Sequence, residues 1–122
     1  MLKNIAIGLT LSLCSTLSAY ANPGQDAKDC LTVSNGEEKV IFHNTCDEQI
    51  FVLWCGNLKY SNQRCGDGPD GGFYTHSNNL APGQDYDIDM VGEYNYATCR
   101  GGIDFGHSKY KDFPDGSYQC LQ

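Results

Sequence analysis

The chain has 122 residues, with 15 Asp and Glu against 8 Lys and Arg, so its formal net charge at neutral pH is −7. A chain this acidic lacks the basic face that binding to nucleic acid or to an anionic membrane surface requires. Its length suffices for one domain. The charge fits a basic protein or a polysaccharide as the partner, and it also fits a role in solubility alone.

Residues 1–21 have the pattern of a cleaved secretory signal peptide. Lys3 precedes an apolar segment, and residues 19–21 (Ala-Tyr-Ala) fit a cleavage site. Cleavage before Cys14 with attachment of a lipid is the alternative, which the bulky Leu13 disfavours. No later segment approaches the roughly 20 apolar residues of a membrane helix. We therefore expect a secreted or periplasmic protein with no membrane insertion after cleavage.

After cleavage, residues 22–29 are predicted to form a flexible leader and residues 30–122 a single disulfide-rich β domain. An even number of cysteines in a small exported chain predicts that all of them pair. The six that remain are Cys30, Cys46, Cys55, Cys65, Cys99 and Cys120.

Sequence alone does not distinguish the many ways of pairing six cysteines. The segment between Cys55 and Cys65 is short and rich in turn residues, which favours that pair. The remaining bridges would confine the unfolded chain most if they closed long loops. This argument predicts Cys46 with Cys99 and Cys30 with Cys120.

The predicted strands begin with residues 31–44, two strands joined by a turn. The turn-forming pair Asn35-Gly36 accepts the positive φ of a tight hairpin, and two glutamates follow it and lengthen the turn. Residues 50–55 form an unbroken β-branched and aromatic run that is too short for a helix. This run predicts a central strand covered on both faces.

A turn at residues 82–83 (Pro-Gly) precedes the next predicted strand. Over residues 85–90 aspartates alternate with Tyr86, Ile88 and Met90, so the two sets face opposite sides. Further strands are predicted over residues 94–99 and at the end of the chain. No stretch repeats apolar residues at helical spacing. We therefore expect an all-β fold, a small disulfide-stapled antiparallel β-sandwich of six or seven strands with one long irregular loop.

The long loop covers residues 56–79. Structureless segments of this length in a compact domain are often functional. Cys65 lies in the middle of the loop and would fix it to the preceding strand. We interpret the loop as a segment displayed for binding.

Three segments, NTCDEQIFVLW, LAPGQDYDIDM and YATC, resemble the first third of thaumatin-like proteins. The resemblance implies a β-sandwich and carbohydrate binding. Those proteins are longer and richer in disulfides, and their acidic cleft lies in parts absent here, so no functional residue is carried over. A small exported cysteine-rich family of bacterial type with a similar layout is the alternative. The matching positions are Asn44, Cys46, Val52, Trp54, Leu80, Gly83, Ile88, Tyr96 and Cys99.

Two patterns in the sequence suggest ligands. Residues 66–71 (GDGPDG) match the dinucleotide fingerprint, but that motif functions only between a strand and a helix, and no helical pattern follows here. Asp67 and Asp70 are hard oxygen donors among glycines and form a weak calcium candidate. The remainder of an EF-hand pattern is missing, so a plain turn is the main interpretation. We expect no cofactor.

Asp85, Asp87 and Asp89 are predicted to share one strand face, with neighbours about 7 Å apart. Carboxylates at such distances can perform acid–base chemistry on a glycosidic bond. A row of aspartates is more often the solvated side of a strand, where it discourages edge pairing. A small hydrolase is therefore retained only as the second alternative function.

Five aromatic residues lie in or near the predicted loops. Exposed aromatic rings stack on sugars or anchor a protein interface at little entropic cost. The alternative is that they cap a small core. We expect at least two of them to be exposed; the five are Tyr60, Phe73, Tyr74, Tyr110 and Phe113.

The function we expect is that of a non-catalytic secreted or periplasmic binding domain. Its acidic surface and loop aromatics would recognise a basic protein partner, as a small inhibitor or immunity-like protein does, because charge steers the encounter and buried rings hold the complex. A carbohydrate-binding module is the first alternative.

Overall fold

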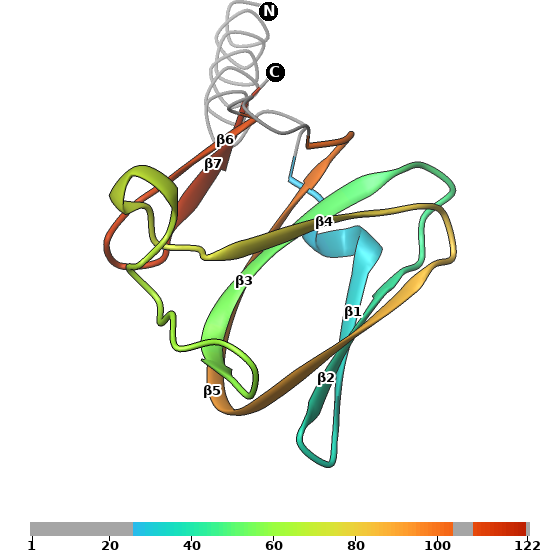
Figure 1. Ribbon diagram of the computed structural model, residues 1–122. Helices are drawn as coiled ribbons and strands as arrows, with labels where there is room; N and C mark the ends of the chain where they lie inside the picture. Colours follow the sequence, from blue (N-terminus) through green and yellow to red (C-terminus); the bar gives the residue numbers. More distant parts are fainter. Residues whose placement is uncertain (1–25, 104–108, 122) are drawn as a thin grey trace, which may run out of the picture.

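The computed structural model describes residues 26–103 and 109–121, and its regular structure consists of β-strands and two short 3₁₀ turns (Figure 1). The predicted signal peptide, Cys14 and residues 22–25 lie outside the described residues. The predicted all-β, antiparallel, disulfide-rich fold is confirmed. In chain order the elements are η1 (Lys28–Cys30), β1 (Leu31–Gly36), β2 (Lys39–Asn44), β3 (Ile50–Leu58), η2 (Pro69–Gly71), β4 (His76–Leu80), β5 (Asp85–Arg100), β6 (Tyr110–Asp112) and β7 (Tyr118–Cys120), where η marks a single 3₁₀ turn.

One bent sheet forms most of the domain. Its five strands are antiparallel in the order β1-β2-β5-β3-β4, and β6 and β7 form a separate hairpin. The long strand β5 pairs with β2 through residues 85–89 and with β3 through its remainder. Gly92, with φ of 73°, lies within the β3-paired stretch, between Val91 and Tyr94, where the pairing with β3 shifts register. The sheet therefore folds over at β5, and its two halves face each other.

The close approach of β3 to β5 explains Gly56. At this point the pairing of the two strands shifts register. A Cβ atom on Gly56 would lie 2.9 Å from the Cβ of Tyr94 and 3.0 Å from the carbonyl oxygen of Glu93. Any larger residue would push the strands apart beside the bend of β5.

Two hydrophobic clusters lie on opposite faces of β3, as its unbroken apolar sequence predicts. Ile50, Val52 and Trp54 contribute to the front cluster, which fills the space between the two halves of the sheet. Phe51, Leu53 and Cys55 contribute to the rear cluster, which also contains residues of β7. All six side chains are at most 4 % exposed, so β3 is the predicted central strand.

The three disulfides correct two of the predicted pairings. Cys55–Cys65 is confirmed, but the other bridges are Cys30–Cys46 and Cys99–Cys120. The reason is local. The β1–β2 hairpin places Leu31 opposite Asn44, so the cysteines just outside its two ends are neighbours. The predicted preference for long loops concerned the unfolded chain and ignored this proximity in the fold.

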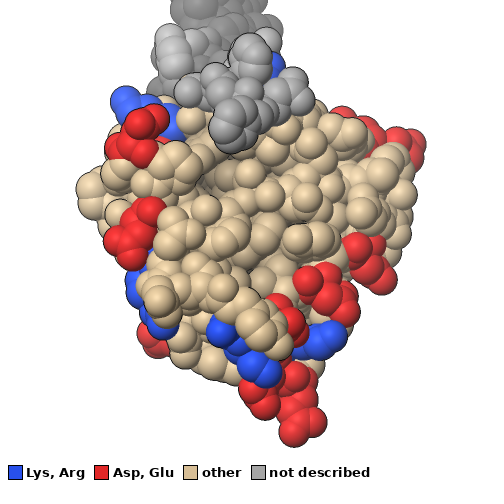
Figure 2. All heavy atoms as spheres, viewed as in Figure 1, with Lys and Arg blue, Asp and Glu red and all other residues tan. Residues whose placement is uncertain are grey.

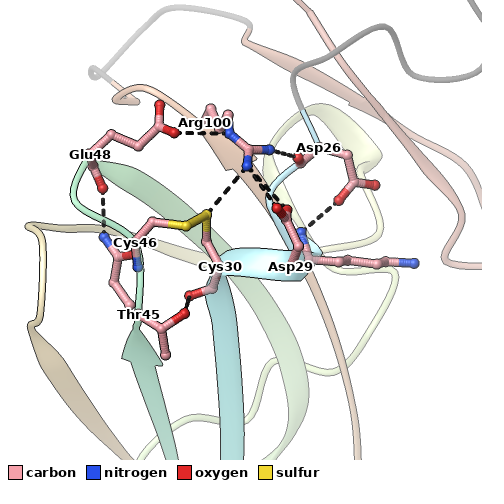
Figure 3. Close-up of polar contacts among 9 residues, drawn as sticks. Asp26, Asp29, Cys30, Thr45, Cys46, Glu48 and Arg100 are labelled. Carbon is pink, nitrogen blue, oxygen red and sulfur yellow. Dashed lines mark hydrogen bonds and ion pairs between the residues drawn. A yellow bond between two sulfur atoms is a disulfide. The ribbon is translucent and has the colours of Figure 1, made fainter.

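Residues 26–29, predicted as part of a flexible leader, are instead packed onto the domain. Ala27 is fully buried, and its N–H donates to the carbonyl oxygen of Thr98 at 3.1 Å. Figure 3 shows the guanidinium of Arg100 among the carboxylates of Asp29 and Glu48 and the carbonyl oxygen of Asp26. This cluster fixes the start of the domain to the end of β5.

The Arg100 cluster also changes the ionisation of its members. The hydrogen bond from Arg100 holds the pKa of Asp29 below its usual value, and Asp29 in turn raises the pKa of Arg100. Both shifts favour the charged forms and hence the ion pair.

Two local predictions differ from the structure. The β1–β2 turn consists of Glu37 and Glu38, since Gly36 already pairs with Lys39, and Glu38 adopts the positive φ of 59°. The long loop is shorter than predicted, because residues 76–80 form strand β4 along β3. The sequence of β4, HSNNL, has no apolar alternation because it is a polar edge strand with β3 on one side only.

Candidate functional site: an aromatic and acidic groove

A groove of about 220 Å³ lies where the bent sheet does not close. β4 pairs only with β3, whereas the first half of β5 pairs with β2, so the two strands diverge from the turn at residues 81–84. Figure 1 shows them as two sides of a wedge with β3 behind. We call this hollow the wedge groove and define it by Trp54, Tyr60, His76, Tyr86, Asp87 and Asp89, which line it.

Aromatic rings form the floor of the wedge groove. Trp54 is 4 % exposed and stacks on the ring of His76, with centroids 5.9 Å apart and planes inclined by 18°. Tyr86, which lies on β5, packs against the Trp54 indole with a distance of 5.5 Å between the ring centroids. The indole Nε1–H is buried and finds no acceptor among the described residues. The floor therefore holds an unmet hydrogen-bond donor, which is uncommon in folded proteins.

Tyr60 stands at the rim of the groove and is 81 % exposed. The backbone beside it is fixed, because the N–H of Lys59 donates to the carbonyl oxygen of Asp89 at 3.1 Å. The Lys59 ammonium also lies 3.1 Å from the carboxylate of Glu38, and this hydrogen bond raises the pKa of Lys59. An exposed ring on an anchored segment is suited to contact a ligand.

Carboxylates form the opposite wall. Asp87 and Asp89 line the groove from β5, and Asp87 lies 3.7 Å from the ammonium of Lys39 on β2. Asp85 lies beside them and contacts the imidazole of His43. In Figure 2 acidic side chains follow the course of the first half of β5, and the centre of this face is free of charged groups. The face presents an uncharged hollow with a negative border.

The structure separates the predicted site residues into two groups. Tyr60, Asp87 and Asp89 meet in the wedge groove, with Asp85 next to them. Phe73 and Phe113 instead line a second hollow of about 250 Å³ between the long loop and the turn that follows β6. Neither ring is exposed, since both side chains are partly buried.

The expectation that at least two of the five aromatics are exposed is wrong, because Tyr60 alone is. Tyr74 is 2 % exposed and belongs to the rear cluster, and Tyr110 packs against the same cluster. The hydroxyl of Tyr74 donates to the carbonyl oxygen of Gly116 at 2.5 Å. Burial raises the pKa of Tyr74 to about 12. These rings hold β6 and β7 onto the sheet and are not available as binding surfaces.

The calcium candidate is not supported by a ligand cluster. The carboxylate of Asp67 accepts the N–H of Arg64 at 2.8 Å and so closes a turn of the loop. Asp70 lies in η2 with φ of 55° and is exposed. Across residues 26–103 and 109–121, no three His, Cys, Asp or Glu side chains are grouped so that they could hold a metal ion.

Three groove residues were missed as site residues in the sequence. Trp54 and Tyr86 fall inside predicted strands, and His76 falls inside the predicted long loop. Their convergence depends on the polar strand β4, which no periodicity indicates. One signal was available: Trp54 is the only tryptophan of the chain and the last large apolar residue of its run.

The chemistry of the wedge groove suits a cationic or amphipathic group. Carboxylates attract an ammonium or guanidinium, and aromatic faces bind such cations within about 6 Å of the ring. The same rings accept the apolar stem of Lys or Arg.

Comparisons with known proteins leave the site without a precedent. No helix within the described residues is long and apolar enough to cross a membrane. The resemblance to thaumatin-like proteins stays a prediction. No protein-family model, no curated protein and no solved structure matches the chain.

Proposed function

We propose that this protein is an exported, non-catalytic binding domain that recognises a basic protein partner through the wedge groove. The observation that carries the proposal is the meeting of the exposed Tyr60 with Asp87 and Asp89 above an aromatic floor. A small inhibitor or immunity-like protein would use such a site to neutralise a basic enzyme.

Electrostatics and burial have separate parts in this proposal. The acidic border accelerates encounter with a basic surface, and its influence reaches about 8–10 Å at physiological salt. Tyr60 then loses its exposed surface in the complex, as tyrosine at interface hot spots does. A basic side chain placed in the groove would meet carboxylates on one wall and rings on the floor.

The positions of the aspartates favour binding over hydrolysis. Lys39 pairs with Asp87 and His43 contacts Asp85, so two of the three carboxylates already have basic neighbours on β2. The geometry thus supports an attractive surface more than a catalytic pair.

Export to an oxidising compartment, secreted or periplasmic, is part of the proposal. Three disulfides within a small domain are typical of proteins in such compartments and rare in the cytosol. The predicted signal peptide agrees with this location.

Affinity capture tests the proposal. The oxidised mature protein is immobilised and exposed to the native extracellular or periplasmic proteins at low and at high salt. We expect retention of one basic protein, weakened by salt, by Asp87→Asn and by Tyr60→Ala. Asp47→Asn is the matched control, because Asp47 is exposed and has no described ion pair. Equal retention by Asp87→Asn and Asp47→Asn would contradict a role for the groove.

Carbohydrate binding is the second candidate, favoured by the 81 % exposure of Tyr60 beside carboxylates. An exposed ring can stack on a sugar face, and carboxylates accept hydrogen bonds from sugar hydroxyls. Stacking is insensitive to salt, whereas attraction between charged surfaces is screened. Retention on cell-wall polysaccharide that persists at high salt and is lost in Tyr60→Ala would favour this candidate.

A further inference from the structure

We propose that the edge of β5 beside the wedge groove accepts an extended basic segment of the partner as an added antiparallel strand. The inference rests on the proposed function and specifies it, since it names the part of the partner that binds and the backbone that receives it. Strand addition of this type uses main-chain hydrogen bonds for affinity and alternate side chains for specificity.

Hydrogen bonds with β2 show which backbone groups of β5 are already used. The N–H of Met90 donates to the carbonyl oxygen of Glu38, and the carbonyl oxygen of Gln84 accepts the N–H of Asn44. Met90 lies in β5 and Gln84 directly precedes it, and both positions are even-numbered. Alternate residues of an antiparallel strand direct their backbone groups to opposite sides. The even-numbered residues between positions 84 and 90 therefore face β2.

The odd-numbered residues face the other way, toward the groove. The carbonyl oxygen of Asp89 confirms this direction, because it accepts the N–H of Lys59 from the loop after β3. Asp85 and Asp87 direct their N–H and C=O groups to the same side. No strand within the described residues pairs with them there, since β3 joins β5 only from Met90 onward. The open edge is thus short and ends where Lys59 begins to cover it.

The side chains along this edge indicate what an added strand would contain. A residue opposite Asp87 would lie on the same face, with Cβ atoms about 5 Å apart. Lys or Arg at that position would be paired with a carboxylate. The next residue would lie over Tyr86 or Ile88, on the side of the Trp54 floor, where an apolar side chain fits. The geometry therefore selects alternation of basic and apolar residues.

A second copy of this chain does not fit the edge. Antiparallel pairing of two such edges would place aspartates of one chain opposite aspartates of the other, and like charges directly across a strand pair destabilise it. Charged edge strands are a known protection against aggregation. The aspartates thus exclude the chain itself and favour a basic segment.

Synthetic peptides test the edge directly. The first probe is a blocked nine-residue peptide of alternating Lys and Val. The second has Glu in place of Lys. The third and fourth carry backbone N-methyl groups on the Lys or on the Val residues, which remove N–H donors without changing charge. Binding is followed by the fluorescence of Trp54, the only tryptophan, and by site-resolved amide hydrogen exchange of the oxidised mature protein.

We expect the Lys–Val peptide to bind and the Glu–Val peptide not to. N-methylation of Lys should weaken binding at least tenfold, because the residue opposite Asp87 has its N–H directed at β5, whereas N-methylation of Val should change affinity less than twofold. Exchange of the Asp87 amide should slow at least tenfold in the complex. Exchange of the Tyr86 and Ile88 amides, already bonded to β2, should hardly change.

Two outcomes separate this inference from the proposed function. Salt-sensitive binding that tolerates N-methylation of Lys and leaves the Asp87 amide unprotected would overturn strand addition and keep recognition of a basic partner. Failure of every basic peptide, together with no basic protein in the capture experiment, would overturn both.

A variant of the domain gives an independent test. Asp87→Pro removes the outward N–H without removing a bond to β2, and proline is tolerated at such edge positions. Asp87→Asn removes the same charge and keeps the N–H. We expect Asp87→Pro to bind the Lys–Val peptide at least tenfold more weakly than Asp87→Asn, and equal affinity would overturn the inference. If Asp87→Pro does not fold, the N-methylated peptides provide the decision.

Discussion

The front and the rear of the central strand β3 differ in how they are closed. At the rear, two disulfides, Cys55–Cys65 and Cys99–Cys120, join the sheet to the long loop and to β7. The hydroxyl of Tyr74 is bonded there to the turn between β6 and β7. At the front, the wedge groove has no crosslink, its indole N–H has no acceptor among the described residues, and one rim ring is exposed.

This difference separates stability from recognition. A small domain buries a limited fraction of its surface and often depends on disulfides for stability. The third disulfide, Cys30–Cys46, packs with the front cluster but does not line the wedge groove, so this part of the front can present an open edge and an unfilled hollow. Changes at the rear should therefore alter unfolding more than binding, and changes at the groove should do the reverse.

Removal of the rear crosslink should have the largest effect. The double variant Cys99→Ala/Cys120→Ala releases β7 from β5 and should lower the free energy of unfolding by about 2–4 kcal/mol. Urea denaturation followed by far-ultraviolet circular dichroism measures the change. Trp54 fluorescence of the folded state should stay as in the parent, because the indole lies on the front. A shifted emission maximum in that folded state would show that the two faces are not independent.

Gly56→Ala addresses the point where β3 passes the bend of β5. The new methyl group would lie about 3 Å from atoms of Tyr94, Glu93 and Met90. Overpacking of this kind should destabilise the domain by about 1–3 kcal/mol. Thermal unfolding measures it, with Gly83→Ala as the comparison, where no atom lies within 4 Å of the added methyl but φ is 75°. A larger loss of stability in Gly83→Ala than in Gly56→Ala would show that a positive φ costs more than the close contacts. It would then contradict overpacking as the larger effect.

Alkaline pH should weaken the rear face selectively. Burial raises the pKa of Tyr74 to about 12, above its value near 10 in the unfolded chain, so this contribution is complete below pH 10 and is lost as pH rises toward 12. The pKa of Tyr118 is raised for the same reason. After allowance for solvent screening we expect a loss of about 1–2 kcal/mol over this range.

Tyr74→Phe should reduce this alkaline loss, and urea titrations at several pH values measure it. The variant also loses the bond to Gly116, at a cost of about 1 kcal/mol at neutral pH. Tyr60→Phe is the control, because its ring is 81 % exposed and its alkaline profile should match the parent. If the stability of Tyr74→Phe fell as steeply with rising pH as that of the parent, the alkaline loss would not come from Tyr74.

The same contrast explains what the sequence could predict. The unbroken apolar run identified β3, and alternation identified the start of β5, because both patterns depend on which side chains are apolar; together with the turn residues they predicted the all-β class. They did not identify β4, whose polar sequence is held by pairing with β3 alone, and without β4 the wedge between β4 and β5 cannot be inferred. Asp87, Asp89 and Tyr60 were found by residue type. Trp54 and His76 were not, since their role depends on that long-range arrangement.

Tyr60→Ala should have the smallest effect on stability and a large one on recognition. The ring is 81 % exposed, so its loss should change the free energy of unfolding by less than about 0.5 kcal/mol. If Tyr60 anchors a partner, the same change should weaken binding by about 1–2 kcal/mol, or roughly tenfold. Isothermal calorimetry with the captured partner and urea denaturation measure the two quantities on one sample. A loss of stability equal to the loss of affinity would mean that Tyr60 shapes the groove and does not touch the partner. Stability and recognition would then not be separated between the rear and the front of β3.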